Sequence, residues 1–174
     1  MTIYYVGKRG GSQVAGNNVM LTYASLNGRK GHEVGRELLA QMYRRATGED
    51  LPPIAITPRG KPYFPDNPWH FSISHTKNHA FCALAKCPVG IDAEEQDRVV
   101  HLKLADKVLS ESEKLRFEGY ADKKDAFLRL WVLKEASVKL TGEGLKGYPN
   151  HTDFSPDDPR IEIIDGCYVA VLTE

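Results

Sequence analysis

The stretch that decides the fold of this chain runs Trp131-Val132-Leu133-Lys134-Glu135-Ala136-Ser137-Val138-Lys139. Trp131, Glu135 and Lys139 recur every four residues, so they lie along one stripe of a predicted helix. The residues around that stripe are apolar on nearly every side, which predicts that the helix is buried. A carboxylate in such surroundings is costly to desolvate unless a cation meets it. For Glu135 that cation is either Lys139 or a bound metal, and the simplest interpretation is an i,i+4 Glu–Lys pair on a helix surface.

The composition is ordinary for a folded protein, and 174 residues suit one domain or two small fused halves. Lys and Arg balance Asp and Glu at 23 each, so no net field favours nucleic acid or an anionic membrane. No apolar run approaches the roughly 20 residues of a membrane span, and the N-terminus lacks the layout of a secretory signal. The three cysteines have no CxxC spacing and fit reduced thiols in a cytoplasmic protein.

Strands and helices alternate along the chain, which predicts an α+β fold. Helices are expected at 33–46 and at 101–109. A third helix is expected to begin at the Ser110-x-x-Glu113 capping box. The buried helix is expected to run from a cap at Asp122 to about Leu140, where Gly142 and Gly144 end it. Strands are expected at 2–6, 19–24, 54–56, 70–74, 80–85, 89–93, 161–164 and 167–172, the last two joined by an Asp165-Gly166 hairpin turn.

A pair of acids ends the predicted strand that begins at Val89. Asp92 and Glu94 are two residues apart, so both project from the same face of that strand, about 7 Å apart at the backbone. Two such carboxylates repel each other unless a cation lies between them. Mg²⁺ suits this arrangement, since it usually takes one or two protein carboxylates together with phosphate oxygens and water. The alternative is a solvated strand end.

Two further motifs offer groups that bind phosphate. Ser74 and His75 end a predicted strand and present a hydroxyl and an imidazole. They do not form a nucleophile pair, because adjacent residues of a strand point to opposite faces and no G-x-S-x-G elbow is present. Lys61, in the Gly60-Lys61-Pro62 turn, is a cation on a stiffened loop. For each of these motifs the alternative is an exposed polar side chain.

Together these motifs, in this order, resemble the 4′-phosphopantetheinyl transferase superfamily. The resemblance is to the longer type that activates peptide synthetases more than to the short trimeric type, and it covers about residues 36–145. The motifs that carry it are Gly60-Lys61-Pro62, Phe71-x-x-Ser74-His75, Gly90-Ile91-Asp92-x-Glu94, Ser110-x-x-Glu113, Trp131-x-x-Lys134-Glu135-Ala136-x-x-Lys139 and Gly142-x-Gly144-Leu145.

The resemblance implies a reaction in which the phosphopantetheine arm of coenzyme A moves to a serine of an apo carrier protein and adenosine 3′,5′-bisphosphate is released. It implies that Asp92, Glu94 and Glu135 hold Mg²⁺. It also implies that the nucleotide and its phosphates are contacted by Arg36, Lys61, Ser74 and His75, and the pyrophosphate by Lys139. The proton of the serine passes to Glu135 or to a metal-bound water, and we favour Glu135.

The resemblance further implies two similar α/β halves related by a pseudo-twofold, with the coenzyme in the cleft between them. The first half would span residues 1–89, and the second, which carries the acids, residues 90–174. Both sides of the cleft then come from one chain, which predicts a functional monomer. The N-terminal region is short for this type: apolar residues stand at Leu21 and Ala24, where the family has cations for the 3′-phosphate, and Arg29 and Lys30 are possible substitutes.

Two alternatives compete with this interpretation. One is a Mg²⁺-dependent phosphohydrolase that uses the same acids on another phosphate. The other is a non-catalytic module that binds coenzyme A or a carrier protein without turnover. Carrier proteins of this kind are typically acidic near the modified serine, so a local basic patch is expected for docking. The candidates are Lys103, Lys107, Lys114 and Arg116.

Overall fold

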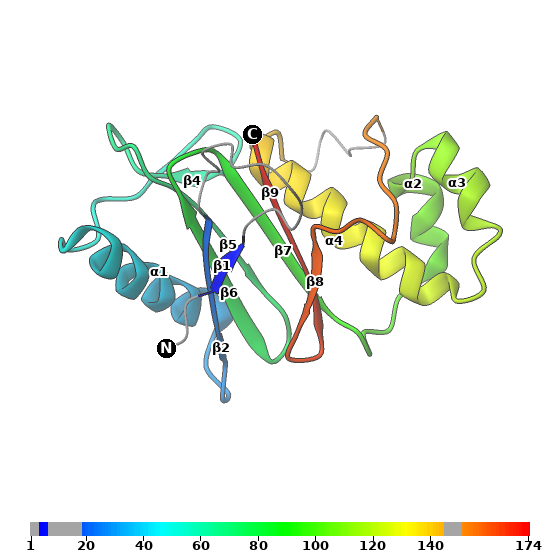
Figure 1. Ribbon diagram of the computed structural model, residues 1–174, viewed down its shortest axis with the longest axis horizontal. Helices are drawn as coiled ribbons and strands as arrows, with labels where there is room; N and C mark the ends of the chain where they lie inside the picture. Colours follow the sequence, from blue (N-terminus) through cyan, green and yellow to red (C-terminus); the bar gives the residue numbers. More distant parts are fainter. Residues whose placement is uncertain (1–3, 7–18, 145–150) are drawn as a thin grey trace.

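The computed structural model describes residues 4–6, 19–144 and 151–174, and helices and strands occur along all of it, as expected for an α+β fold (Figure 1). The predicted positions Thr2 and Leu145 lie outside the described residues. Within the described part, no helix has the length and apolar character needed to cross a membrane. Cys82, Cys87 and Cys167 are free thiols, as predicted.

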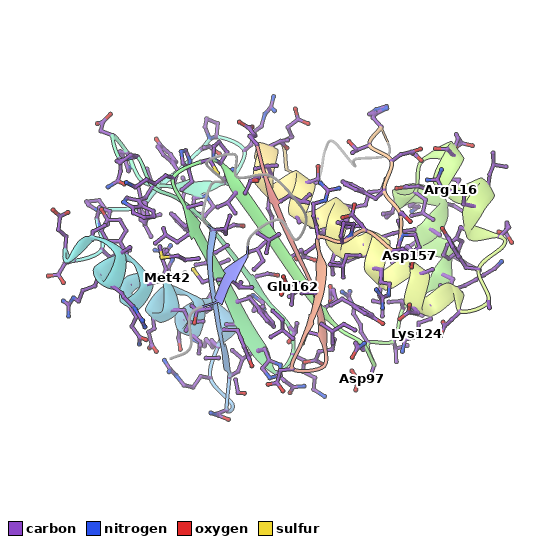
Figure 2. The ribbon with its side chains drawn as sticks, in the orientation of Figure 1. Met42, Asp97, Arg116, Lys124, Asp157 and Glu162 are labelled. Atoms are coloured by element: carbon purple, nitrogen blue, oxygen red, sulfur yellow. The ribbon has the colours of Figure 1, made fainter. Side chains whose placement is uncertain are left out.

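The first sheet has four antiparallel strands in the order β1-β2-β6-β5. They are β1 (Tyr4–Val6), β2 (Val19–Ser25), β6 (His79–Ala85) and β5 (His70–His75). Helix α1 (Gly31–Thr47) covers one face of this sheet and ends at Gly48 in the left-handed conformation, φ +80°. Figure 2 shows Met42 of α1, which is fully buried in that layer. A short hairpin, β3 (Ala55–Ile56) with β4 (Pro62–Tyr63), lies beside the sheet.

The second sheet has the order β7-β9-β8, formed by β7 (Val89–Glu95), β9 (Cys167–Thr173) and β8 (Ile161–Ile164). Helix α4 (Lys123–Thr141) packs on it, and the Asp122 carboxylate caps the helix by accepting the N–H of Asp125. Three short helices gather at the far end of α4: η1 (Leu102–Leu104), α2 (Ala105–Val108) and α3 (Glu111–Phe117) (Figure 1). The predicted capping box at Ser110 and the Asp165-Gly166 hairpin are both confirmed.

The hydrophobic core forms three layers. One lies between α1 and the first sheet, and another lies between α4 and the second sheet. The third lies between the two sheets, where Phe81, Ile91 and Val169 are buried. Strand β6 faces two of these layers, so Cys82 packs toward α1 while its neighbour Phe81 packs toward the second sheet. The helices thus cover the outside of the paired sheets (Figure 1).

The helix predicted at 101–109 is observed as two contiguous pieces, η1 and α2, in which Leu102 and Leu104 remain more than a third exposed. Strands β6 and β7 belong to different sheets, and the segment that contains Cys87 and Pro88 connects them. The division into halves 1–89 and 90–174, and a pseudo-twofold between them, stay predictions.

Candidate active site

Two serine hydroxyls join the sheets. Ser72 and Ser74 alternate along β5 and so project from one face. The Ser72 hydroxyl accepts the N–H of Ile91 at 3.1 Å, and the Ser74 hydroxyl accepts the N–H of Ala93 at 3.2 Å. These N–H groups lie on the edge of β7 that faces β5, and the hydroxyls satisfy them in place of a neighbouring strand. The intervening residue, Asp92, is thereby placed beside Ser74.

Asp92 is the centre of the candidate site. Only 6% of it is exposed, and its Oδ1 accepts hydrogen bonds from Ser74 Oγ at 2.9 Å and from Lys139 Nζ at 2.7 Å. Lys139 Nζ also donates to Ser74 Oγ at 3.1 Å. The second carboxylate oxygen, Oδ2, is buried and has no hydrogen-bond partner among the described residues. Since a buried carboxylate oxygen is costly to leave unsatisfied, Oδ2 is well suited to receive a cation.

Gly90 brings α4 close enough to β7 for the contact between Lys139 and Asp92. A Cβ atom at Gly90 would lie 2.0 Å from the carbonyl oxygen of Ala136 and 2.5 Å from the backbone nitrogen of Leu140. Only glycine therefore allows this approach of strand and helix. Lys139 then reaches across to the strand instead of along its own helix.

The simplest interpretation of Glu135, an i,i+4 ion pair with Lys139, is therefore wrong in this structure. Lys139 pairs with Asp92, and Glu135 forms no ion pair with any described residue. The pKa of Glu135 is raised, chiefly by burial and then by the charge of Asp92, while Lys139 and Arg98 oppose the increase. The charge of Asp92 on β7 thus acts on Glu135 of α4.

The carboxylate of Glu94 is already paired with a cation. It lies on the same side of β7 as Asp92, as the alternation predicts, and pairs with the guanidinium of Arg98. That guanidinium also lies over the ring of Trp131, 5.7 Å from its centre. Among the described residues, no group of three His, Cys, Asp or Glu side chains is placed to hold a metal ion. Mg²⁺ needs only one or two protein carboxylates, and Asp92 with Glu135 fits that requirement because Asp92 Oδ2 lacks a partner.

A cleft of about 260 Å³ opens beside this cluster. Its walls come from β5, the end of α4, the Arg59–Pro62 turn, Gly142 and Gly144, and both Lys61 and Lys139 line it. Lys61 donates to the carbonyl oxygen of Leu140, and burial lowers its pKa. Its side chain lies against Gly142, where a Cβ atom would come within 2.7 Å of Lys61 Cδ. The cleft therefore has two ammonium groups at its wall.

His75 and Arg36 are placed apart from the acids. His75 is exposed at the end of β5, and its ring lies so close to the start of α1 that a Cβ atom on Gly31 would be 2.5 Å from its Cγ. Arg36 lies on the exposed side of α1 and forms no hydrogen bond or ion pair with the described residues. Arg29, a possible substitute for the 3′-phosphate contact, pairs with Glu37 instead.

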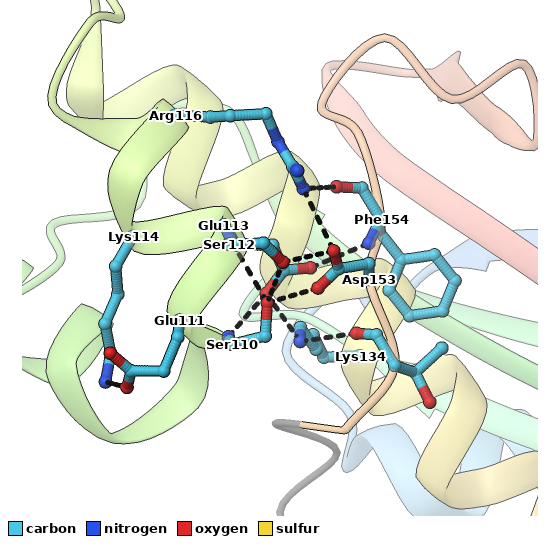
Figure 3. A network of polar contacts seen from close by, with 10 residues as sticks. Ser110, Glu111, Ser112, Glu113, Lys114, Arg116, Lys134, Asp153 and Phe154 are labelled. Carbon is cyan, nitrogen blue, oxygen red and sulfur yellow. Dashed lines mark hydrogen bonds and ion pairs between the residues drawn. The ribbon is translucent and has the colours of Figure 1, made fainter.

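A buried ion pair between α3 and α4 could not be recognised from the sequence (Figure 3). Lys134 Nζ lies 2.6 Å from Glu113 Oε2, and each side chain is at most 2% exposed. Glu113 also accepts the N–H groups of Ser110 and Phe154, both at 2.8 Å, and Lys134 donates to the carbonyl oxygen of Thr152 at 2.8 Å. The capping-box spacing predicted only the contact of Glu113 with Ser110. Ser72 and Arg98 were missed as well. The contact of Ser72 with Ile91 and that of Arg98 with Trp131 join segments distant in sequence, whereas the i,i+4 spacing of Glu94 and Arg98 is a local signal.

Known proteins similar to this chain were found by two comparisons. Residues 88–165 match the family model of the 4′-phosphopantetheinyl transferase superfamily. The 4′-phosphopantetheinyl transferase Sfp of Bacillus subtilis (strain 168) is 37% identical over 89 residues, which is 49% of this chain and 39% of that protein. The 4′-phosphopantetheinyl transferase gsp of Aneurinibacillus migulanus is 35% identical over 88 residues, 49% of this chain and 36% of that protein. The uncharacterized protein YieE of Escherichia coli (strain K12) is 30% identical over 146 residues, 80% of this chain and 59% of that protein. The matched part thus spans about two fifths of the two transferases.

Proposed function

Because the chain belongs, over residues 88–165, to the 4′-phosphopantetheinyl transferase superfamily, we propose that it transfers the 4′-phosphopantetheine arm of coenzyme A to a serine of an apo carrier protein. The products are the holo carrier protein and adenosine 3′,5′-bisphosphate. The observation that carries the proposal is the cluster of Asp92, Ser74 and Lys139 beside a cleft with two ammonium groups. A polyanionic nucleotide is the ligand that such a cleft favours.

The proposed cleft holds coenzyme A, with Lys61 and Lys139 toward its phosphates. Asp92 and Glu135 would hold Mg²⁺, and Glu94 would join them if Arg98 released it. Bound there, Mg²⁺ neutralises the charge that develops on the phosphate oxygens during transfer. Each of these groups comes from one chain, which supports a functional monomer.

The proposed transfer is a single displacement at phosphorus. The serine oxygen forms a bond to the β-phosphorus of coenzyme A, and the bond from that phosphorus to the bridging oxygen of the adenosine bisphosphate breaks. The electron pair leaves with the bisphosphate, where Lys139 neutralises it. The serine proton goes to Glu135, whose raised pKa suits a group that accepts a proton.

The surface formed by α2 and α3 has some of the features expected for docking an acidic carrier protein. A groove of about 560 Å³ runs there, lined by Leu102, Leu115 and Phe117 among others. Of the expected cations, Lys114 pairs with Glu111 and Arg116 lies 3.7 Å from Asp153, so their charges are already balanced. The proposal therefore relies on Lys103 and Lys107, and unchanged carrier affinity after charge reversal at Lys107 would count against it.

Intact mass spectrometry of apo carrier proteins tests the function. Fatty-acid, polyketide and peptide carriers are each incubated with the protein, coenzyme A and Mg²⁺. We expect one of them to gain a phosphopantetheine arm, and we expect Glu135→Gln to abolish the gain. Glu162→Gln, at an exposed position of β8, is the control that should keep full activity. If no carrier gains mass, the proposal is wrong, and phosphate release or coenzyme A binding then separates a phosphohydrolase from a binding module.

A further inference from the structure

A third hydroxyl continues the row formed by Ser72 and Ser74. Thr76, two residues further along and buried, donates its hydroxyl to Glu95 Oε1 at 3.0 Å. The partners of the three hydroxyls alternate along β7 in the same way: Ile91, Ala93 and Glu95. Each partner lies 19 positions after its hydroxyl in the chain. The ends of β5 and β7 are therefore joined in a constant register, and the last of the three contacts joins two side chains.

The Glu95 carboxylate also holds the turn between β5 and β6. Its Oε1 accepts the backbone N–H of Asn78 at 2.9 Å in addition to the hydroxyl of Thr76. That hydroxyl accepts the N–H of His79 at 3.0 Å, and the Thr76 N–H donates to the His79 carbonyl oxygen at 2.8 Å. The carbonyl oxygen of Asn78 accepts the N–H of Leu26 at 2.7 Å. One carboxylate thus fixes a turn that is itself bonded to the segment before α1.

His75 lies between two of the contacts with β7. Its neighbours Ser74 and Thr76 are each bonded to that strand, and its own side chain points to the opposite side, since residues of a strand alternate. On that side the ring lies against Gly31 at the start of α1, where an added Cβ atom would be 2.5 Å from His75 Cγ. The position of the imidazole relative to β7 is therefore set by the contacts on either side of it.

We infer that Glu95 is a positioning residue for His75. The resemblance implies that His75 contacts the nucleotide and its phosphates, and Asp92, on the same strand as Glu95, belongs to the proposed Mg²⁺ site. A nucleotide that reaches both needs them at a fixed separation, and a displacement of the turn by about 1 Å is enough to weaken such an arrangement. This inference rests on the proposed function and adds a residue that acts through another.

Glu95→Leu tests the inference, because leucine has a similar size but accepts no hydrogen bond. The dissociation constant of coenzyme A is measured by titration calorimetry with Mg²⁺ and without a carrier protein. We expect it to rise about tenfold, while kcat at saturating coenzyme A and the KM for the carrier stay within about twofold. Glu95→Gln keeps an oxygen that can accept both hydrogen bonds, so it should restore most of the affinity.

The decisive variant combines Glu95→Leu with His75→Ala. If Glu95 acts through His75, its substitution has no further effect on the dissociation constant once the imidazole is absent. A further tenfold loss in the His75→Ala background would mean that Glu95 acts by another route, and the inference would be wrong. An unchanged dissociation constant in either single variant would overturn it as well.

Thr47→Val is a matched control for the loss of a turn contact. The Thr47 hydroxyl donates to the Tyr43 carbonyl oxygen at 2.9 Å and accepts the N–H of Glu49 at 3.0 Å, at the far end of α1. We expect a lower urea midpoint and an unchanged dissociation constant. Weaker coenzyme binding by this control would mean that destabilisation alone explains the loss, against the inference. A wild type that binds no coenzyme A refutes the proposed function as well, whereas equal binding by the wild type and Glu95→Leu refutes the inference alone.

Discussion

Replacing Gly90 by alanine should separate β7 from α4 and damage the site without touching any of its polar groups. The added Cβ atom would lie 2.0 Å from the carbonyl oxygen of Ala136, and side-chain Cβ atoms essentially never come within 3.0 Å of such an atom. Strand and helix must therefore move apart by about 1 Å (3.0 − 2.0). The neighbour is backbone and not the end of a flexible side chain, so no rotamer change relieves the contact.

The size of the effect follows from the contact that this approach makes possible. Lys139 Nζ lies 2.7 Å from Asp92 Oδ1, and a separation larger by about 1 Å places the two atoms beyond hydrogen-bond range. Overpacking of this kind costs about 1–3 kcal/mol of folding free energy. A misplacement of about 1 Å in a catalytic arrangement costs on the order of 10²-fold in rate. We therefore expect a folded but destabilised variant with transfer reduced about a hundredfold.

Urea denaturation and the mass-spectrometric transfer assay measure the two effects separately. Gly119→Ala is the control, because the nearest atom to an added Cβ there is 3.4 Å away and its φ is not in the left-handed region. That variant should keep both its stability and its activity. A Gly90→Ala protein with wild-type stability and a rate within about threefold of the wild type would refute the argument that close approach creates the site.

Three further substitutions test other parts of the structure. Lys134→Met leaves the buried carboxylate of Glu113 without its cation, and we expect a loss of about 3–5 kcal/mol in urea denaturation; a loss below 1 kcal/mol would contradict the importance of the pair. Ser74→Ala removes both an acceptor for a β7 N–H and a donor to Asp92, so it should lower the free energy of unfolding by about 1–3 kcal/mol. Ser72→Ala removes one such contact and should lower it less. Burial raises the pKa of Cys167 to about 11, from 9.0, so the folded protein keeps a proton that the unfolded chain releases above pH 9. The stability of the wild type relative to Cys167→Ala should therefore fall from pH 9 to pH 11, and a constant difference over that range would be the contrary result.

Local chemistry explains why much of the fold could be predicted. The Asp165-Gly166 turn places both residues at positive φ, 49° and 75°, and the strands on either side pair as a hairpin. The Ser110 capping box likewise needs only residues close in sequence. The helix predicted at 101–109 is observed over residues 102–108, but its first turn is the 3₁₀ helix η1 rather than α-helix. The helical period did not predict burial there, since Leu102 and Leu104 remain exposed.

The sequence predicted which residues lie at the candidate site better than it predicted which of them pair with each other. Alternation along a strand correctly placed Asp92 and Glu94 on one side of β7. The spacing of α4, however, favours pairing within the helix, and the observed partner of Lys139 is on β7. Such contacts join residues that are distant in sequence. The close approach of β7 and α4 depends on Gly90, and that role becomes apparent only when the structure places Gly90 against Ala136.

The pairing of charges also singles out Glu135. Asp92 is paired with Lys139 of α4, and Glu94 is paired with Arg98, four residues further along the chain. Glu135 lies between these pairs and has no ion-pair partner among the described residues, while burial and Asp92 raise its pKa. Among the acids of the site, this combination is why our proposal assigns the proton of the acceptor serine to Glu135.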